Sequence, residues 1–259
     1  LILNFDSKIN LVLKDPNNEN FLVCRNKPLE CSSKFFTNSE IENLLESKLN
    51  LNESPYQYIG EYAGVNFLNK VRRSNYNKIK FQDSNFYFDE DIKFVFDSEK
   101  NQFNIFQNKP GARAFFYKGM LKDLDINFHG YAEEFTNELA NYPVDQRGLT
   151  GCLSLIHLKV SNLKINSNNS SCEDTVNLIN VVGTFEEINI KDSFSDGLDV
   201  DFSELEIDRI NIFSSRNDCV DFSAGKYKLN ELNLTNCGDK GLSVGEKSVF
   251  QLKEIVVAN

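Results

Sequence analysis

Residues 196–244 read DGLDVDFSELEIDRINIFSSRNDCVDFSAGKYKLNELNLTNCGDKGLSV, and within this stretch one pattern returns every 22 residues. With related segments on its N-terminal side, the pattern has five members: GCLSLIH from Gly151, DTVNLIN from Asp174, DGLDVDF from Asp196, DCVDFSA from Asp218 and KGLSVGE from Lys240. The last four are each 22 residues apart, and the first is offset by 23. Such a period is typical of proteins that stack one structural unit per repeat.

Each repeat has the residue pattern of short strands with one buried face, because apolar and polar residues alternate. Stacking the repeats produces the inward columns Val176, Leu198, Val220, Leu242 and Leu178, Val200, Phe222, Val244. A second strand and a shorter third strand per repeat supply further columns, among them Ile188, Ile210, Leu232 and Ile255. Three short strands per repeat of about 22 residues predict an all-β fold, a right-handed parallel β-helix.

The alternative fold is a leucine-rich repeat solenoid, because LNELNLTNC from Leu229 fits the pattern L-x-x-L-x-L-x-x-C. That fold has one strand per repeat, and its consensus Asn or Cys position reads Ser193, Ser215 and Cys237 here. The rest of each repeat is strand-like rather than helical. The parallel β-helix is therefore the favoured fold.

The N-terminal part of the chain lacks the 22-residue period. Thr37 and Glu40 form a capping box ahead of an amphipathic helix over 41–49, and a second helix is expected over 61–73. From about Lys78 the pattern becomes strand-like. We therefore expect a small α+β cap or domain over 1–77 and a parallel β-helix over 78–259, with regular coils from about residue 150.

Composition limits the classes of partner. The net charge of −10 repels phosphate backbones, so nucleic acid is not an expected partner. No apolar run approaches the roughly 18 residues of a membrane span. Trp is absent, so a sugar site would have to stack on Tyr or Phe, of which the chain has 9 and 22.

The six cysteines form three locally spaced pairs: Cys24 with Cys31, Cys152 with Cys172, and Cys219 with Cys237. Close pairing favours disulfides and an extracytoplasmic, oxidising compartment. The alternative is six buried thiols, since cysteine packs as a small hydrophobic residue. The cysteine spacings do not match a zinc site, and no cofactor other than a bound Ca²⁺ is expected.

Acidic residues gather in the turns that enter the first strand of successive repeats. In register, Asp196 and Asp218 share a column with Lys240, and Asp199 and Asp221 share an outward column. Because adjacent coils stack about 4.8 Å apart, we expect neighbouring carboxylates to lie within roughly 5–7 Å of each other. Like charges at that distance repel one another.

Such repulsion requires a cation, a shared proton or water to relieve it. Arg216 and Lys240 are the internal candidates, and a Ca²⁺ ion held by Asp199 and Asp221 is the external one. The alternative is that the aspartates only form tight turns between coils.

Three segments in this region resemble consecutive motifs of polygalacturonase-type glycoside hydrolases, which read NTDG, GDDC and GHG on a right-handed parallel β-helix. They are FSDGLDV at 194–200, RNDCVDFSAG at 216–225 and CGDKGLSVGE at 237–246. The resemblance covers only about 55 residues, at the same coil spacing as in that family.

The resemblance implies catalytic roles for Asp196 and Asp218 in activating a water molecule, and a disulfide between Cys219 and Cys237. Two positions depart from the family: its general acid is replaced by Asn217, and its histidine by Lys240. Hydrolysis with inversion needs an acid that protonates the leaving oxygen, and asparagine cannot do so.

A longer stretch, from about Gly148 to Lys247, resembles uncharacterised bacterial cell-surface β-helix repeat proteins. They carry the same S-D-x-x-D-x-D, N-D-x-x-D and G-D-K-x-x-S-x-G-E turns. This resemblance implies a cell-surface location and no particular activity.

These observations predict a secreted or cell-surface β-helix that binds polysaccharide through acidic turns, with or without modifying it. The candidate catalytic residues are Asp196, Asp218 and Lys240, and the candidate substrate-binding residues are Asp199, Asp221, Arg216 and Asn217. One alternative is an active polysaccharide lyase, epimerase or hydrolase. Another is a non-catalytic structural or adhesive solenoid.

Overall fold

The computed structural model describes residues 11–14, 21–25, 30–32, 71–72, 74–131, 144–145, 147–245 and 247–258. The chain divides into two compact units, one comprising residues 1–71 and 145–149, the other residues 72–144 and 150–259.

In the first unit, three described strands form an antiparallel sheet in the order β1 (Leu11–Lys14), β2 (Phe21–Arg25), β3 (Glu30–Ser32). The β2–β3 register places the backbones of Cys24 and Cys31 opposite each other. Their side chains, and the helix predicted over 41–49, lie outside the described residues. Of the helix predicted over 61–73, only Val71–Arg72 are described, and they form the short strand β4 instead.

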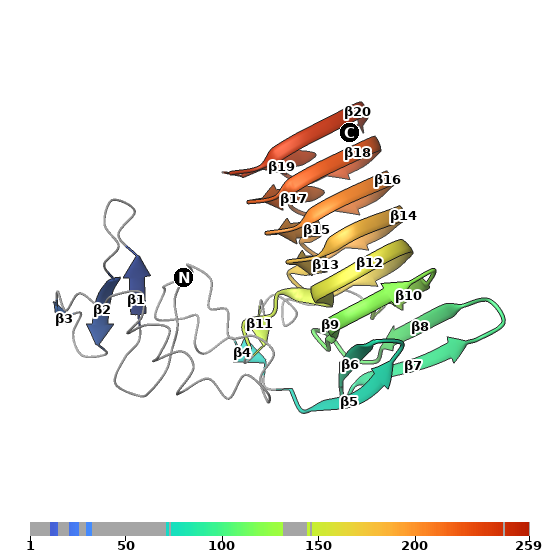
Figure 1. Ribbon diagram of the computed structural model, residues 1–259, viewed down its shortest axis with the longest axis horizontal. Coiled ribbons are helices and arrows are strands. Elements are labelled where there is room, and N and C mark those ends of the chain that lie inside the picture. Colours follow the sequence, from blue (N-terminus) through green and yellow to red (C-terminus); the bar gives the residue numbers. More distant parts are fainter. Residues whose placement is uncertain are drawn as a thin grey trace. The chain divides into compact units, whose positions relative to one another are not determined.

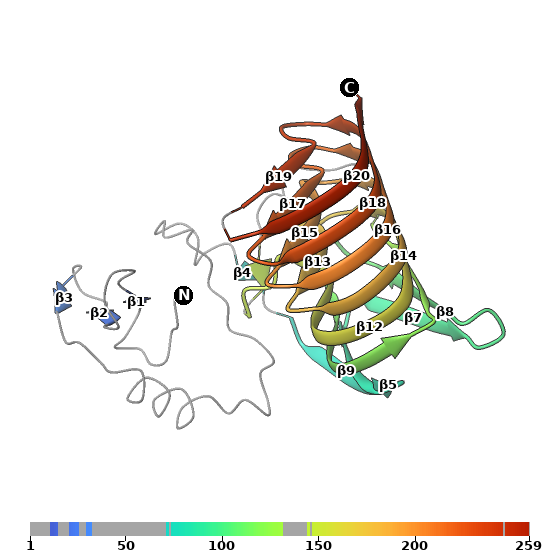
Figure 2. The same ribbon diagram turned by 45° about the horizontal axis from the view of Figure 1, so that its top comes forward.

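The second unit is a parallel β-solenoid of about six turns (Figure 1). Two ladders of parallel strands meet in β12 (Gly151–Ser170), a 20-residue strand that belongs to both. The short-strand ladder continues through β13 (Asp174–Ile179), β15 (Asp196–Asp201), β17 (Val220–Ser223) and β19 (Leu242–Val244). The long-strand ladder continues through β14 (Val182–Ser193), β16 (Glu204–Ser215), β18 (Lys226–Cys237) and β20 (Val249–Ala258). Figure 2 shows the long strands of successive coils lying side by side.

Antiparallel hairpins precede the parallel coils. They are β5 (Tyr76–Phe81) with β6 (Ser84–Asp89), and β7 (Ile92–Asp97) with β8 (Gln102–Gln107). β9 (Ala114–Lys122) and β10 (Asp125–His129) then pair in parallel with β12, and β11 (Val144–Asp145) is a two-residue strand.

The hairpins enclose an aromatic core at this end of the solenoid. The ring of Phe86 lies 4.8 Å from that of Phe103 and 4.6 Å from that of Phe116, measured between centroids, and all three side chains are fully buried. The hairpins therefore cover a solenoid end that would otherwise expose apolar side chains and unpaired strand edges.

The register confirms the predicted inward columns. Val176 pairs with Leu198, Leu198 with Val220, and Val220 with Leu242. Ile188, Ile210, Leu232 and Ile255 stack in the same way along the long-strand ladder. Ile210 and Leu232 are fully buried between two coils, whereas Ile255 on the last strand is 44% exposed. A column residue is thus buried mainly by the coils on either side of it.

The predicted all-β parallel β-helix is confirmed, and the described residues contain no α-helix. Two strand ladders per coil exclude the leucine-rich repeat. Each long strand joins the two strands that the sequence suggested as separate elements, as β14 does over Val182–Ser193. None of the described residues forms a helix long and apolar enough to span a membrane.

Two corners of each coil have positive φ, and both recur at the coil period. One corner follows the short strand, at Asn180 (52°), Phe202 (52°) and Ala224 (48°). The other lies at the end of the long strand, at Asp192 (57°), Ser214 (67°) and Asn236 (55°). This left-handed backbone conformation is unfavourable for a bulky side chain such as that of Phe202.

Two of the three expected disulfides are present in the described residues. Cys152 is bonded to Cys172 and Cys219 to Cys237, each with a Cα–Cα distance of 5.3 Å. Each bond spans about one coil, with sequence separations of 20 and 18 residues. A bond of this span constrains the unfolded chain and stabilises the coil it closes.

We expect Val220→Asp to destabilise the solenoid by several kcal/mol, because it places an unpaired carboxylate in a fully buried column. Val244→Asp is the matched control, since Val244 is 46% exposed in the last coil of the same ladder. Urea denaturation followed by circular dichroism measures both variants. Equal loss of stability in the two would contradict the assigned core.

Candidate functional site

Seven carboxylates lie along the outer side of the short-strand ladder and in the turns that lead into it. This acidic turn face comprises Glu173, Asp174, Asp196, Asp199, Asp201, Asp218 and Asp221. Asp199 of β15 pairs in register with Asp221 of β17, and Asp174 of β13 pairs with Asp196 of β15. The four predicted aspartates, Asp196, Asp199, Asp218 and Asp221, therefore occupy neighbouring coils on one face.

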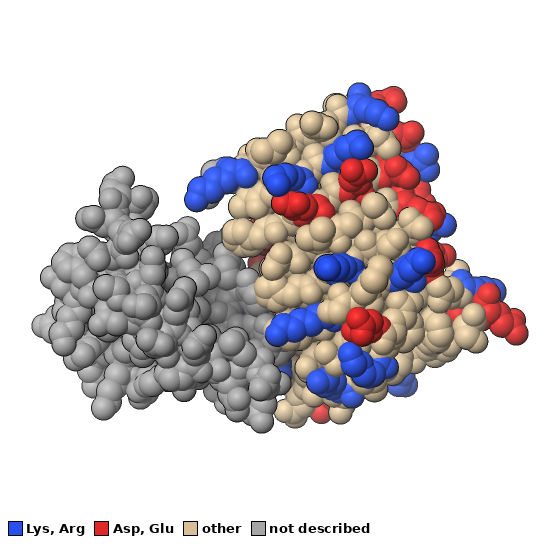
Figure 3. Space-filling model, viewed as in Figure 1, with Lys and Arg blue, Asp and Glu red and all other residues tan. Residues whose placement is uncertain are grey.

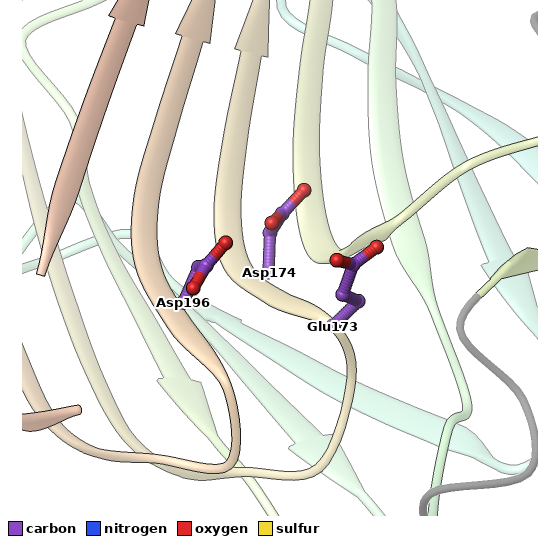
Figure 4. Close-up of side chains that lie close together, drawn as sticks. All are labelled: Glu173, Asp174 and Asp196. Carbon is purple, nitrogen blue, oxygen red and sulfur yellow. The ribbon is translucent and has the colours of Figure 1, made fainter. Parts of the chain in front are cut away.

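The tightest group on this face is Glu173, Asp174 and Asp196, whose carboxylate oxygens lie within 4.8 Å of one another (Figure 4). The first two come from one turn and the third from the turn of the next coil. Asp199 and Asp221, the residues predicted to hold Ca²⁺, are not part of this group. Asp199 Oδ2 instead accepts a hydrogen bond of 2.7 Å from Asn177 Nδ2.

Asp196 and Asp218 both bind the backbone of the following coil. Asp196 Oδ1 accepts a hydrogen bond from the backbone N–H of Asp218 at 2.9 Å, and Asp218 Oδ1 accepts one from the backbone N–H of Lys240 at 2.9 Å. These bonds join turns that are 22 residues apart. The two predicted catalytic residues thus contribute directly to the stacking of the turns.

The remaining predicted residues surround these two aspartates. Lys240 Nζ lies 2.9 Å from Asp218 Oδ2 and 2.9 Å from an oxygen of Asp239. Asn217 Nδ2 donates to Asp196 Oδ1 at 2.7 Å. The guanidinium carbon of Arg216 lies 5.4 Å from the centroid of the Phe194 ring. Lys240 therefore supplies the cation that the sequence suggested for this column.

Elsewhere on the solenoid, charged side chains pair between coils. Basic and acidic side chains are interspersed over the solenoid face seen in Figure 3. One such pair is Lys226 with Glu204, at 2.9 Å. On the acidic turn face carboxylates instead stack on carboxylates. Burial and charge repulsion are therefore expected to raise the pKa values of these groups.

Two carboxyl groups on this face titrate near neutral pH. Burial, with a further contribution from the charge of Asp196, raises the pKa of Glu173 to about 7, although Arg113 opposes the shift. Burial and the charge of Asp221 raise the pKa of Asp201 to about 6. Each group therefore exists in both protonation states between pH 5 and 8.

Four further carboxyl groups on this face have pKa values shifted in the same direction. Burial raises the pKa values of Asp174 and Asp199 well above their usual range, and the charges of Glu173 and Asp174 respectively add to the shifts. Burial also raises the pKa values of Asp196 and Asp221. At a given pH, these carboxyl groups therefore hold more protons than the same groups would hold if they were exposed and far apart.

Glu173, Asp174 and Asn177 are not among the site residues predicted from the sequence. Asn177 is buried and donates to both Asp199 and Asp174, at 2.7 and 3.2 Å, so it holds the two carboxylates side by side. The 22-residue register already aligned Asp174 with Asp196 and Asn177 with Asp199. Extending the site by one coil toward the N-terminus would have found all three.

Comparison with protein-family models, curated proteins and solved structures found no match to this chain.

We expect the protein to be more stable at pH 5 than at pH 7.5. A carboxyl group whose pKa is higher in the folded chain binds protons more tightly there, so the free energy of unfolding falls as pH rises above the unfolded pKa. The fall extends from the ordinary values near 4 to the raised values, about 6 for Asp201 and about 7 for Glu173.

Thermal unfolding at a series of pH values measures this effect. Glu173→Gln should raise Tm at pH 7.5 by a few degrees and reduce the slope of Tm against pH. Glu254→Gln, an exposed carboxylate on β20, is the control and should change neither. If the slope of Tm against pH is equal in wild type and Glu173→Gln, the ionisation of Glu173 does not contribute to the loss of stability at high pH.

Proposed function

We propose that the protein is a secreted or cell-surface β-helix that binds polysaccharide through the acidic turn face. The observation that carries the proposal is the stack of seven carboxylates on adjacent coils, in which burial raises the pKa values of Glu173, Asp174, Asp196, Asp199, Asp201 and Asp221. Carboxylates of this kind gain free energy from any ligand that brings hydrogen-bond donors or positive charge to them.

Sugar hydroxyl groups are such donors, and a hydrogen bond to a charged acceptor is stronger than one between neutral groups. The carboxylates repeat once per coil along the solenoid axis. An extended chain of sugars lying along that axis would meet one set of acceptors per coil. This geometry favours a polymer over a small molecule.

Two further observations support the proposal. The turns at 194–246 resemble consecutive motifs of polygalacturonase-type hydrolases, a pectin-degrading family. The two disulfides are typical of proteins from oxidising compartments and support a location outside the cytoplasm.

A cation extends the range of sugars that the face would accept. Carboxylate oxygens are preferred ligands of Ca²⁺, and an ion bound among Glu173, Asp174 and Asp196 would offset most of their negative charge and could also accept a carboxylate of the sugar as a ligand. Acidic sugars, which the bare face repels, would then bind through the ion. We therefore expect neutral sugars to bind without Ca²⁺ and uronates only with it.

The double variant Asp199→Asn, Asp221→Asn tests the proposal without touching Asp196 and Asp218, which bind the backbone. It keeps the shape of the two side chains and removes two stacked carboxyl groups. Calorimetric titration with neutral and galacturonic oligosaccharides, with and without Ca²⁺, measures binding. The variant should be more stable than wild type and should bind at least one class about tenfold more weakly.

Asp208→Asn is the matched control, because Asp208 is an exposed aspartate on β16, away from the acidic turn face. It should bind as wild type does. If the double variant is less stable than wild type and its binding is unchanged, the aspartates only shape the turns. The protein would then be a structural or adhesive solenoid.

A second candidate function is catalysis, and the raised pKa of Glu173 favours it. Asn217 cannot protonate a leaving group, but a carboxyl group with a pKa of about 7 can do so near neutral pH. Asp218 lies two coil steps along the axis from the turn of Glu173, on the order of 10 Å. That is close to the separation at which a second carboxylate can activate a water molecule in an inverting hydrolase.

Release of reducing ends from a panel of polysaccharides tests this candidate. If the wild-type protein is active, Glu173→Gln should lower the rate by about a hundredfold or more. Asp208→Asn should leave the rate unchanged. Absence of reducing ends from every polysaccharide would reject the hydrolase, and full activity in Glu173→Gln would reject Glu173 as the acid.

A further inference from the structure

A second periodic surface lies on the outer side of the long-strand ladder, away from the acidic turn face. Asparagines of six successive strands stack there, and each donates from Nδ2 to Oδ1 of the preceding one over 2.7–3.0 Å. The members of this amide ladder are Asn104, Asn127, Asn166, Asn189, Asn211 and Asn233.

A groove with a volume of about 440 Å³ runs beside the amide ladder. The column two residues further along each strand forms its other side, through His129, Lys191, Phe213 and Thr235 among others. Phe213 is 46% exposed, although it is a large apolar side chain. His129 stacks on the ring of Phe106 with a centroid distance of 4.8 Å. We call this surface the amide groove.

The amide groove offers neutral hydrogen-bonding groups at every coil. A ladder amide inside the column uses one N–H and one oxygen lone pair on its neighbours, which leaves a second N–H and a second lone pair. In Asn211 the second N–H is donated to Glu187 Oε1 at 3.1 Å. Adjacent donors and acceptors of this kind suit hydroxyl groups, which both donate and accept. The exposed ring of Phe213 adds a flat apolar surface of the kind on which a sugar ring stacks.

The charge of the lining points to an uncharged ligand. The groove is lined by no Asp or Glu side chain, and its one formally charged residue is Lys191. Lys191 Nζ lies 6.0 Å from the centroid of the Phe213 ring. The net charge of −10 on the whole chain repels polyanions at long range.

An added peptide strand fits this surface less well. Peptides that extend a sheet bind to the free backbone groups of an edge strand. The amide groove lies across the face of a ladder in which β12, β14, β16 and β18 already pair with neighbours on both sides. Only side chains are offered to a ligand there, and asparagine amides are the commonest of them.

We propose that the amide groove binds a neutral, extended glycan chain, independently of the acidic turn face. The ligand runs across the strands, along the solenoid axis. From His129 to Phe213 the groove crosses three coil steps of about 4.8 Å, on the order of 14 Å, which accommodates several sugar units. Phe213 stacks against one ring, and the ladder amides hydrogen-bond the hydroxyl groups of the others.

Calorimetric titration of the whole chain with cellohexaose, xylohexaose and mannohexaose tests the proposal, with hexagalacturonate as the acidic comparison. At least one neutral hexasaccharide should bind, and Phe213→Ala should weaken that binding by about tenfold. Phe213→Tyr keeps a ring and should bind as wild type does. Because Phe213 is exposed, neither change should affect folding.

Phe202→Ala is the matched control, since Phe202 is also exposed (52%) but lies at a corner outside the groove. In the Asp199→Asn, Asp221→Asn background, Phe213→Ala should still weaken the binding of the neutral hexasaccharide about tenfold, which separates the amide groove from the acidic turn face. Failure of all three neutral hexasaccharides to bind would overturn the proposal. So would unchanged binding in Phe213→Ala, or binding of hexagalacturonate alone.

Discussion

The in-register stacking of parallel strands is the constraint on which the rest of this structure depends. Backbone hydrogen bonds join each coil to the next, so in the regular coils from β12 onward every side chain lies against its equivalent 22 or 23 residues away. Stacking benefits apolar residues, which form a continuous core, and amides, which satisfy one another. It penalises carboxylates, which are buried and brought close to one another on the acidic turn face. Their pKa values are raised by burial first and by the neighbouring charges second.

The regular coils could be predicted because their signal is local and repeated. The alternation around Val176, Leu198 and Val220 identifies the buried face, and the period sets which residues meet. The corners could not be predicted, because Phe202 and Ala224 adopt a left-handed conformation that their residue types do not indicate. The stacking of successive coils imposes this backbone conformation on both residues. The hairpins at 76–107 could not be predicted to cover the end of the solenoid, because their sequence has the pattern of any other strands.

For the acidic turn face, the sequence located the aspartates but not what they bind. Proximity of Asp196 and Asp218 follows from the period, whereas acceptance of a backbone N–H depends on a side-chain orientation that no pattern encodes. Glu173 was not predicted because it lies one coil N-terminal to the predicted site, in a column whose other members are Ser195, Asn217 and Asp239. The amide ladder was not predicted either. An asparagine between two isoleucines, such as Asn189, looks like any polar residue on the outer side of a strand.

The amide ladder also shows how this architecture tolerates added sequence. Asn166 and Asn189 are 23 residues apart, but Asn127 and Asn166 are 39 apart, and both pairs are hydrogen-bonded at 2.9 Å. The corner between β10 and β12 thus accepts a long insertion while the coils on either side remain in register. A loop grafted at such a corner would have both ends anchored by neighbouring coils. Solenoids of this type can therefore acquire new surface loops by evolution or engineering without redesign of the core.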